Sequence, residues 1–273
     1  MIPQFGVAFL PAPGVVPSSQ SSSSLQMGLD VVTYLRTEWV SAALVTNQTP
    51  RSANVCLQLG TQDGRAVQFV PRTVREIITS TIAPDGALPI SVRRQLKQQK
   101  ERRSSIDMMT ITYADQRADD LKETPSNSID VVISLQSAAP MTEQGLDWKQ
   151  SIREAGRVLK AGGRFLFVEQ TKINGEDYLE FVGNLRPPRD NGDVDDFNYA
   201  PMFESIGFDN VDLVLEPHVA GVFVKSSVAG MSTDEVTKRE ANVEKERLDD
   251  LSIVAYERGI KKRKRKKKPT DNA

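Results

Sequence analysis

The segment from Ser128 to Thr171 constrains the fold of this chain more than any other. It opens with an apolar run, residues 129–135, which is short and β-branched, as is typical of a strand buried on both faces. An apolar stripe at helical spacing follows, formed by Trp148, Ile152, Ala155 and Leu159. We expect that helix to end at the Gly162-Gly163 pair, before a second strand, RFLFVE, at residues 164–169. Strand, helix and strand form a βαβ unit with parallel strands, which predicts an α/β domain.

The two ends of this segment resemble the later half of class I S-adenosylmethionine-dependent methyltransferases. IDVVIS, residues 129–134, is similar to the family pattern F-D-V-V-x-S. RVLKAGGRF, residues 157–165, is similar to R-x-L-K-P-G-G-x-L, with Ala161 in place of Pro. The resemblance implies a three-layer, doubly wound sheet of seven strands, parallel with an antiparallel last strand, which is the Rossmann-like methyltransferase fold. Another parallel α/β domain with a similar unit is the alternative.

Composition narrows the chemistry that the chain can perform. One cysteine, Cys56, excludes an internal disulfide framework and a multi-cysteine zinc site, and a reducing compartment is the default. One histidine, His218, argues against multi-histidine metal chemistry. The acidic run at residues 190–196 lacks the spacing of a calcium loop, so no metal site is predicted. No apolar stretch is long enough to predict a transmembrane segment.

Charge and composition divide the chain into four parts. Residues 1–29 carry no charged side chain and are predicted to be a disordered N-terminal segment, with an organelle-targeting role left open. Residues 30–228 form the methyltransferase-like domain, beginning with a helix over residues 30–45. Residues 229–260 are predicted to be a charged helical extension that starts at a capping box, residues 232–235. Residues 261–273 are predicted to be a disordered basic tail.

The first predicted strand runs into a glycine-bearing turn at residues 54–64, NVCLQLGTQDG. The methyltransferase family ends this strand with an acidic residue followed by G-x-G-x-G, because glycine lets the backbone approach the cofactor closely. The resemblance places Gln58, Gly60, Gln62 and Gly64 at these cofactor-binding positions. Gln58 and Gln62 depart from the pattern, since one lacks the negative charge and the other adds a side chain.

Three further cofactor-binding positions follow from the same resemblance. Thr81 stands near the end of the second strand, residues 74–82, where the family holds the ribose with a carboxylate. Asp115 follows the third strand, residues 108–113, at the position that accepts from the adenine amino group. Ser134 ends the fourth strand, and residues 134–136 are expected to line the site. The basic segment 87–105 is predicted to be a solvated helix, with a phosphate-facing patch as the alternative.

The chain beyond the fifth strand carries the predicted substrate side. Residues 174–198 are expected to be a loop, residues 199–207 a short helix, and residues 208–228 a hairpin-like pair of strands broken at Glu216-Pro217. EPHVAGVFVK, residues 216–225, resembles small-molecule methyltransferases of the type 11 group that include the methyltransferase-like 7 proteins. His218 is therefore a weak candidate for a catalytic base, and a structural histidine at a strand junction is the alternative.

The last predicted feature is a run of eight basic residues, which is a candidate nuclear import signal. Its members are Lys261, Lys262, Arg263, Lys264, Arg265, Lys266, Lys267 and Lys268. The chain's net charge of −1 therefore combines a tail of +7 with a body of −8. An import receptor, nucleic-acid phosphates and an anionic membrane surface are the alternative partners. The predicted location is nuclear or cytoplasmic.

Two classes of function follow from these residues. The first is a methyltransferase that uses S-adenosylmethionine to modify a small molecule, or, as a weaker version, a nuclear protein or RNA. The second is a catalytically inactive scaffold or binding protein with the same fold, favoured by Gln58, Gln62 and Thr81. A nicotinamide-binding Rossmann protein fits less well, because the turn lacks G-x-G-x-x-G.

Overall fold

The computed structural model describes residues 21–103, 108–187, 198–206 and 217–266. A sheet of seven strands forms its centre, in the order β3-β2-β1-β4-β5-β9-β8. Its strands are β1 (Val55–Leu59), β2 (Glu76–Thr79), β3 (Thr110–Thr112), β4 (Ile129–Leu135), β5 (Leu159–Gln170), β8 (Phe203–Ser205) and β9 (His218–Lys225). A separate short hairpin pairs β6 (Lys172–Ile173) with β7 (Glu176–Asp177).

Strand directions confirm the predicted Rossmann-like methyltransferase fold. β1, β2, β3, β4 and β5 pair in parallel, whereas β9 is antiparallel to both β5 and β8. The last described strand in the chain is thus the antiparallel one. Strand order reverses between β1 and β4, which are neighbours in the sheet, and in open α/β sheets ligands bind at the carboxyl ends of strands at such a point.

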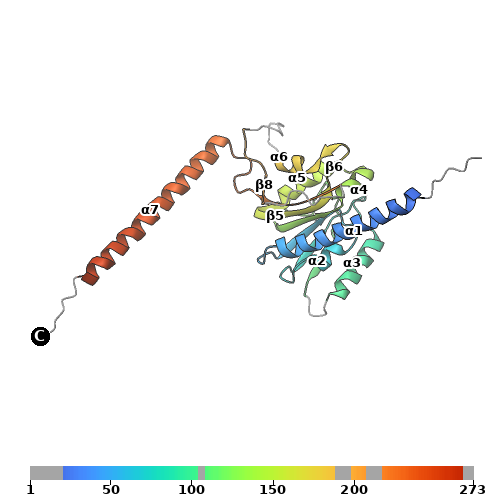
Figure 1. The fold of residues 1–273 in the computed structure, drawn as a ribbon, viewed down its shortest axis with the longest axis horizontal. Helices are drawn as coiled ribbons and strands as arrows, with labels where there is room; N and C mark the ends of the chain where they lie inside the picture. Colours follow the sequence, from blue (N-terminus) through green and yellow to red (C-terminus); the bar gives the residue numbers. More distant parts are fainter. Residues whose placement is uncertain (1–20, 104–107, 188–197, 207–216, 267–273) are drawn as a thin grey trace, which may run out of the picture.

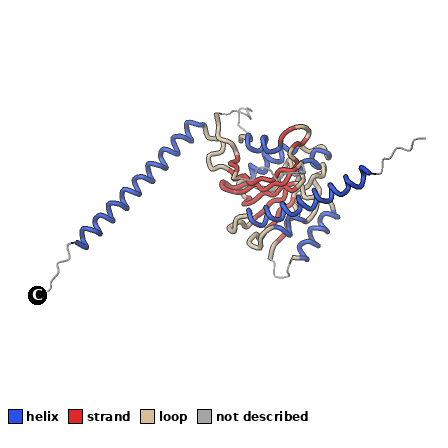
Figure 2. The backbone as a smooth tube through the Cα atoms, in the orientation of Figure 1, coloured by secondary structure: helices blue, strands red, loops and turns tan. Residues whose placement is uncertain are grey.

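Helices cover both faces of the sheet, as Figures 1 and 2 show. On one face lie α1 (Ser21–Gln48), α2 (Arg65–Phe69) and α3 (Ile90–Arg102). On the other lie α4 (Ala138–Glu143), α5 (Trp148–Val158) and α6 (Tyr178–Asn184). This arrangement follows from the apolar β4 and β5, because strands buried on both faces need a covering layer on each side.

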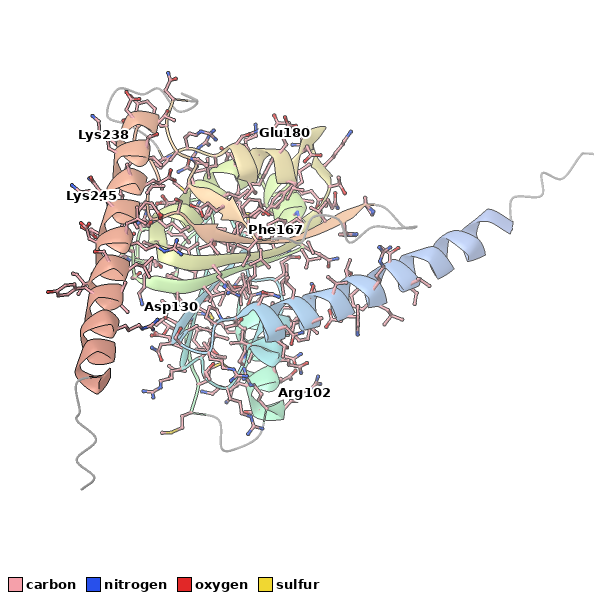
Figure 3. All side chains as sticks on the ribbon, turned by 60° about the vertical axis from the view of Figure 1, so that its left-hand side comes forward. Arg102, Asp130, Phe167, Glu180, Lys238 and Lys245 are labelled. Carbon is pink, nitrogen blue, oxygen red and sulfur yellow. The ribbon has the colours of Figure 1, made fainter. Side chains whose placement is uncertain are left out.

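Two apolar cores fill the spaces between the sheet and these helices. The core beneath α4, α5 and α6 includes Trp148, Tyr178 and Phe167, the last of which is labelled in Figure 3. Trp148 stacks on Tyr178 with ring centroids 5.3 Å apart. The predicted stripe of α5 is buried in this core, from 4% exposure at Trp148 to none at Leu159. The opposite core joins Val45 of α1 to Cys56 of β1. Burial raises the pKa of the Cys56 thiol, so this cysteine is an inert core residue.

Asp130 joins three strands at the amino ends of β1 and β4 (Figure 3). Its carboxylate accepts hydrogen bonds from the backbone amides of Asn54 and Val55 at 2.9 and 3.0 Å, and from Lys160 Nζ at 2.6 Å. Burial alone would raise the pKa of Asp130, but these donors outweigh it and hold the pKa below its ordinary value. The aspartate in the IDVVIS strand therefore fixes how β1, β4 and β5 align.

Several predicted boundaries were wrong. α1 begins at Ser21 rather than at residue 30, and α5 ends at Val158 because Leu159 already has extended backbone that starts β5. The predicted loop at 174–198 contains α6, whose start is capped by Asp177. The predicted helix at 199–207 is instead the strand β8, which pairs with β9. Residues 207–216 of the predicted hairpin lie outside the described residues.

The final helix, α7 (Thr233–Lys266), extends away from the domain in Figures 1 and 2. The predicted capping box starts it: Glu235 accepts from Ser232 N and Oγ, and Ser232 Oγ accepts from Glu235 N. α7 continues past the predicted boundary at residue 260, so the first six basic positions of the tail are helical, while Lys267 and Lys268 lie outside the described residues. No described helix is both long and apolar enough to cross a membrane.

Candidate active site

A polar pocket of about 330 Å³ lies at the carboxyl ends of β1, β4 and β5. It is lined by Gln62, Arg65, Gln136, Ala139, Pro140, Glu143, Glu169, Gln170 and His218. These residues come from the turn after β1 and the start of α2, from the turn after β4 and α4, and from the end of β5 and the start of β9. Gln62 and His218, both predicted as site residues, are far apart in sequence. The sheet brings the turn after β1 and the start of β9 to the same pocket.

The turn after β1 has the backbone that its glycine requires. Gly60 adopts a φ of +54°, and its amide donates to Ser80 Oγ at 3.0 Å. A Cβ atom at Gly60 would lie 2.6 Å from Met141 Cε and 2.8 Å from Ile82 Cγ2. Gly64 has a negative φ and stands just before α2, where a Cβ would meet Gln99. Both glycines are therefore required for close packing as well as for their place in the motif.

Gln136 connects the two halves of the pocket. Its backbone has a φ of +53°, and its carbonyl accepts from Gln62 Nε2 at 2.9 Å. Its side-chain oxygen lies 3.5 Å from the guanidinium of Arg65, and its amide nitrogen lies 3.4 Å from His218 Nε2. Arg65 in turn pairs with Glu38 of α1 at 2.9 Å. Residues from α1, β1, β4 and β9 meet here, so the pocket offers both hydrogen-bond donors and acceptors.

Glu169 is the fully buried carboxylate of the site. It accepts from Ser134 Oγ at 2.7 Å, from Ser137 N and Oγ at 2.9 and 3.1 Å, and from Ala138 N at 3.1 Å. Burial raises the pKa of Glu169, although these four donors oppose the rise. The pKa of Tyr178 is raised well above its usual value by burial and by the nearby charge of Glu169.

The side-chain oxygen of Gln58 is a buried hydrogen-bond acceptor near the end of β1. Its side chain is 4% exposed, and Oε1 has no hydrogen-bond partner among the described residues. A buried carbonyl oxygen without a donor is costly. This atom, together with the close turn at Gly60, fits a polar ligand that places a donor against the end of β1.

Of the predicted cofactor positions only Gln62 lines the pocket, whereas Gln58, Gly60, Gly64, Thr81, Asp115 and Ser134 lie outside its lining. Thr81 is 1% exposed, and its hydroxyl accepts from Ala83 N at 3.0 Å. The exposed Asp115 pairs with Arg93 at 2.7 Å and also accepts from Leu88 N. Both residues have internal partners, and their contacts with a cofactor stay a prediction.

Sequence reasoning missed Arg65, Glu169 and Gln170 as pocket residues. Glu169 ends the apolar strand RFLFVE, and a lone carboxylate at the carboxyl end of a buried strand was a signal available in the sequence. Arg65 gave no such signal, because its partner Glu38 belongs to a helix whose position depends on the whole fold. Within the described residues, no group of His, Cys, Asp or Glu is arranged to hold a metal ion.

Comparison with known families covers the segment that supplies both turns of this pocket. Residues 57–167 match the methyltransferase domain family. The match runs from β1 to β5 and includes the turns after β1 and β4. Enzymes of this class I family take their methyl group from S-adenosylmethionine. No curated protein matches this sequence.

Solved structures with a similar chain trace are distant in sequence. The YcgJ protein from Bacillus subtilis is 20% identical with a TM-score of 0.38, and the match covers 48% of this chain and 50% of that one. Magnesium protoporphyrin IX methyltransferase from Synechocystis PCC 6803 is 14% identical with a TM-score of 0.49, covering 79% and 87%. N-methyltransferase NodS from Bradyrhizobium japonicum is 10% identical with a TM-score of 0.47, covering 72% and 99%. The chain spans about half the length of YcgJ.

Proposed function

We propose that this protein transfers the methyl group of S-adenosylmethionine to a small-molecule acceptor in the pocket at the ends of β1, β4 and β5. The observation that carries the proposal is the pocket itself, which lies at the reversal of strand order and takes its two turns from the segment that matches the methyltransferase domain. Its volume of about 330 Å³ is at the small end of ligand sites. The resemblance of residues 216–225 to methyltransferase-like 7 proteins also supports a small acceptor.

In this proposal the polar end of the cofactor is held through amide and guanidinium groups. These belong to Gln62, Arg65 and Gln136 of the pocket lining and to Gln58, which is buried at the end of β1 outside that lining. The cofactor supplies an activated methyl group on a positively charged sulfur. Transfer breaks the bond from sulfur to the methyl carbon and forms a bond to the acceptor heteroatom. The pocket therefore has mainly to align the acceptor and to exclude water.

In this proposal His218 receives the proton that the acceptor loses. It is half-buried at the start of β9 and lines the pocket beside Gln136. A neutral imidazole can accept a proton near neutral pH. We assign His218 the role of base in this proposal.

An inactive scaffold with the same fold is the second candidate. It is favoured by the internal partners of Thr81 and Asp115, and by the absence of a carboxylate at the ribose position. Two acceptor oxygens on one carboxylate bind a pair of hydroxyls better than one threonine hydroxyl does. In this candidate the domain would present its surfaces to partners without binding the cofactor.

Titration of the purified full chain with S-adenosylmethionine and S-adenosylhomocysteine in a calorimeter distinguishes the two candidates. We expect saturable binding of both ligands. Gln62→Leu should weaken it about tenfold, because it removes a hydrogen-bonding group of the pocket. The matched control is Gln68→Leu on the exposed side of α2, which should bind as the wild type does. Absence of binding at millimolar ligand would establish the scaffold instead.

The basic tail supports a proposal about location and partners. The positive positions 261–266 belong to the end of α7, which extends away from the domain in Figure 1. We propose that an import receptor binds this run and brings the protein to the nucleus. Nucleic-acid phosphates are the competing partner, since they attract the same charges.

A further inference from the structure

The turn between β4 and α4 is held by a buried carboxylate and by the backbone bond from Gln136 N to Val168 O at 2.7 Å. Ser134 Oγ on β4 and the backbone amides of Ser137 and Ala138 all donate to Glu169. The two amides belong to the start of α4, so Glu169 of β5 fixes where the turn ends. Removal of these acceptors would leave buried donors unpaired, which costs more than the bonds themselves contribute.

The same turn holds Gln136 in a backbone conformation that few side chains adopt. Its φ of +53° is in the left-handed region, which costs a non-glycine residue free energy unless the surroundings impose it. The donors on either side, Ser134 and Ser137, are both bound to Glu169. The hydrogen bonds to the Glu169 carboxylate thus offset the free-energy cost of the left-handed backbone at Gln136.

We propose that Glu169 is a positioning residue that sets the place of Gln136 in the pocket. Gln136 bonds to Gln62 and faces Arg65 and His218, so its position determines how the turn after β1 and the start of β9 come together around a ligand. Glu169 borders the pocket, but its side chain is 0% exposed and its oxygens already accept from four donors, so in this proposal it acts on the ligand through Gln136. The inference rests on the proposed function, because it assigns Gln136 to the contact with bound S-adenosylmethionine or S-adenosylhomocysteine.

A double-mutant cycle tests this role. Glu169→Gln keeps the size of the side chain and removes its charge, and Gln136→Asn shortens the amide while tolerating the left-handed backbone. Each single change should weaken S-adenosylhomocysteine binding about tenfold or more, measured by calorimetry on the full chain. If Glu169 acts through Gln136, the double variant should bind no more weakly than the weaker single variant.

Amide hydrogen exchange gives a second readout that needs no ligand. In Glu169→Gln, exchange at Ser137 and Ala138 should speed up by about tenfold or more while the strands stay protected. Glu154→Gln is the matched control, since Glu154 also accepts a backbone amide, that of Leu121, but lies outside the pocket lining. It should lower stability without changing S-adenosylhomocysteine affinity or the exchange of the turn.

Three outcomes would overturn the proposal. Additive losses in the double variant would show that Glu169 and Gln136 act separately. Equal losses of affinity in the Glu154 and Glu169 variants would show general destabilisation. Unchanged exchange at Ser137 and Ala138 would show that the turn does not depend on the carboxylate. If the wild type binds no S-adenosylhomocysteine, the proposed function fails, and hydrogen exchange alone decides whether Glu169 positions the turn.

Discussion

Two structural constraints act on Gly60, in the turn after β1. Its φ of +54° disfavours any side chain, and Met141 and Ile82 leave no space for a Cβ atom. We predict that Gly60→Ala lowers the free energy of unfolding by about 2–4 kcal/mol, since backbone strain and overpacking add together. Urea denaturation followed by circular dichroism measures the loss.

Gly145→Ala is the control for the Gly60 prediction. Gly145 has a φ of +79°, but a Cβ there would meet no atom within 4 Å. Gly145→Ala should therefore lower the free energy of unfolding only by the cost of backbone strain, about 1 kcal/mol. Similar losses at the two glycines would contradict the claim that close packing requires Gly60.

For single residues, the sequence indicated which positions lie near the pocket better than it indicated what each side chain contacts. Gly60, Gln62 and His218 were found from the motif and from the strand pattern, and the structure places all three at or beside the pocket. Asp115 was expected to face a cofactor, but Arg93, on a helix that precedes it in the chain, is its ion-pair partner. A side chain's partner depends on how elements pack, and local patterns do not contain that information.

At the scale of the strands, the hydrogen bonds and ion pair that Asp130 makes between β1, β4 and β5 should stabilise the fold to a degree that depends on pH. Its lowered pKa means that the ionised form stabilises the folded chain above the ordinary pKa of 3.8, and that this stability is lost as pH falls through the folded value. We predict that Asp130→Asn lowers the free energy of unfolding by about 1 kcal/mol at pH 7, after allowing for solvent screening. Thermal unfolding at pH 7 and below pH 4 measures this, and the two proteins should converge in acid.

Asp120→Asn provides the comparison for Asp130. Asp120 pairs with Lys122 at 3.8 Å and is exposed. An exposed pair contributes little, so this change should alter stability by less than about 0.5 kcal/mol. If Asp130→Asn were equally mild, Asp130 would not be joining the strands.

Helices and strands were predicted correctly where the element itself is long enough to show a clear apolar pattern. β4 and the stripe of α5 were predicted because their apolar periods are strong within the element itself. β8 was predicted as a helix because three residues carry too little pattern, and its pairing with β9 decides its conformation. α6 was missed within a segment dominated by Pro and Asp, although Asp177 gave a capping signal.

For the molecule as a whole, the domain and the basic end of α7 should behave independently. We predict that deletion of residues 261–268 leaves the unfolding temperature unchanged and releases a fluorescent fusion of the protein from the nucleus. The reason is that like charges in a row contribute binding energy only with an oppositely charged partner. Microscopy of the fusion and thermal unfolding of the purified chain are the two measurements.

A charge-neutral version of the tail distinguishes the effect of its charge from the effect of its length. Replacement of the eight basic residues by Gln keeps the chain length and should have the same effect as deletion. If the fusion keeps its distribution in both variants, the tail is not an import signal. If location changes only with deletion, length rather than charge is what the partner recognises.

The pairing of β1 with β4 also affects how the chain reaches its folded state. The bond from Val55 to Asp130 spans 75 residues and lies at the amino ends of β1 and β4. Because the carboxyl ends of the same two strands border the pocket, both strands must be synthesised and must pair before the pocket can form. Contacts between residues so distant in sequence form slowly, because the chain first loses the entropy of a long loop. The βαβ unit from β4 to β5 is local by comparison. It is the expected nucleus onto which the earlier strands assemble, and ligand-binding ability should appear late and in one step during refolding.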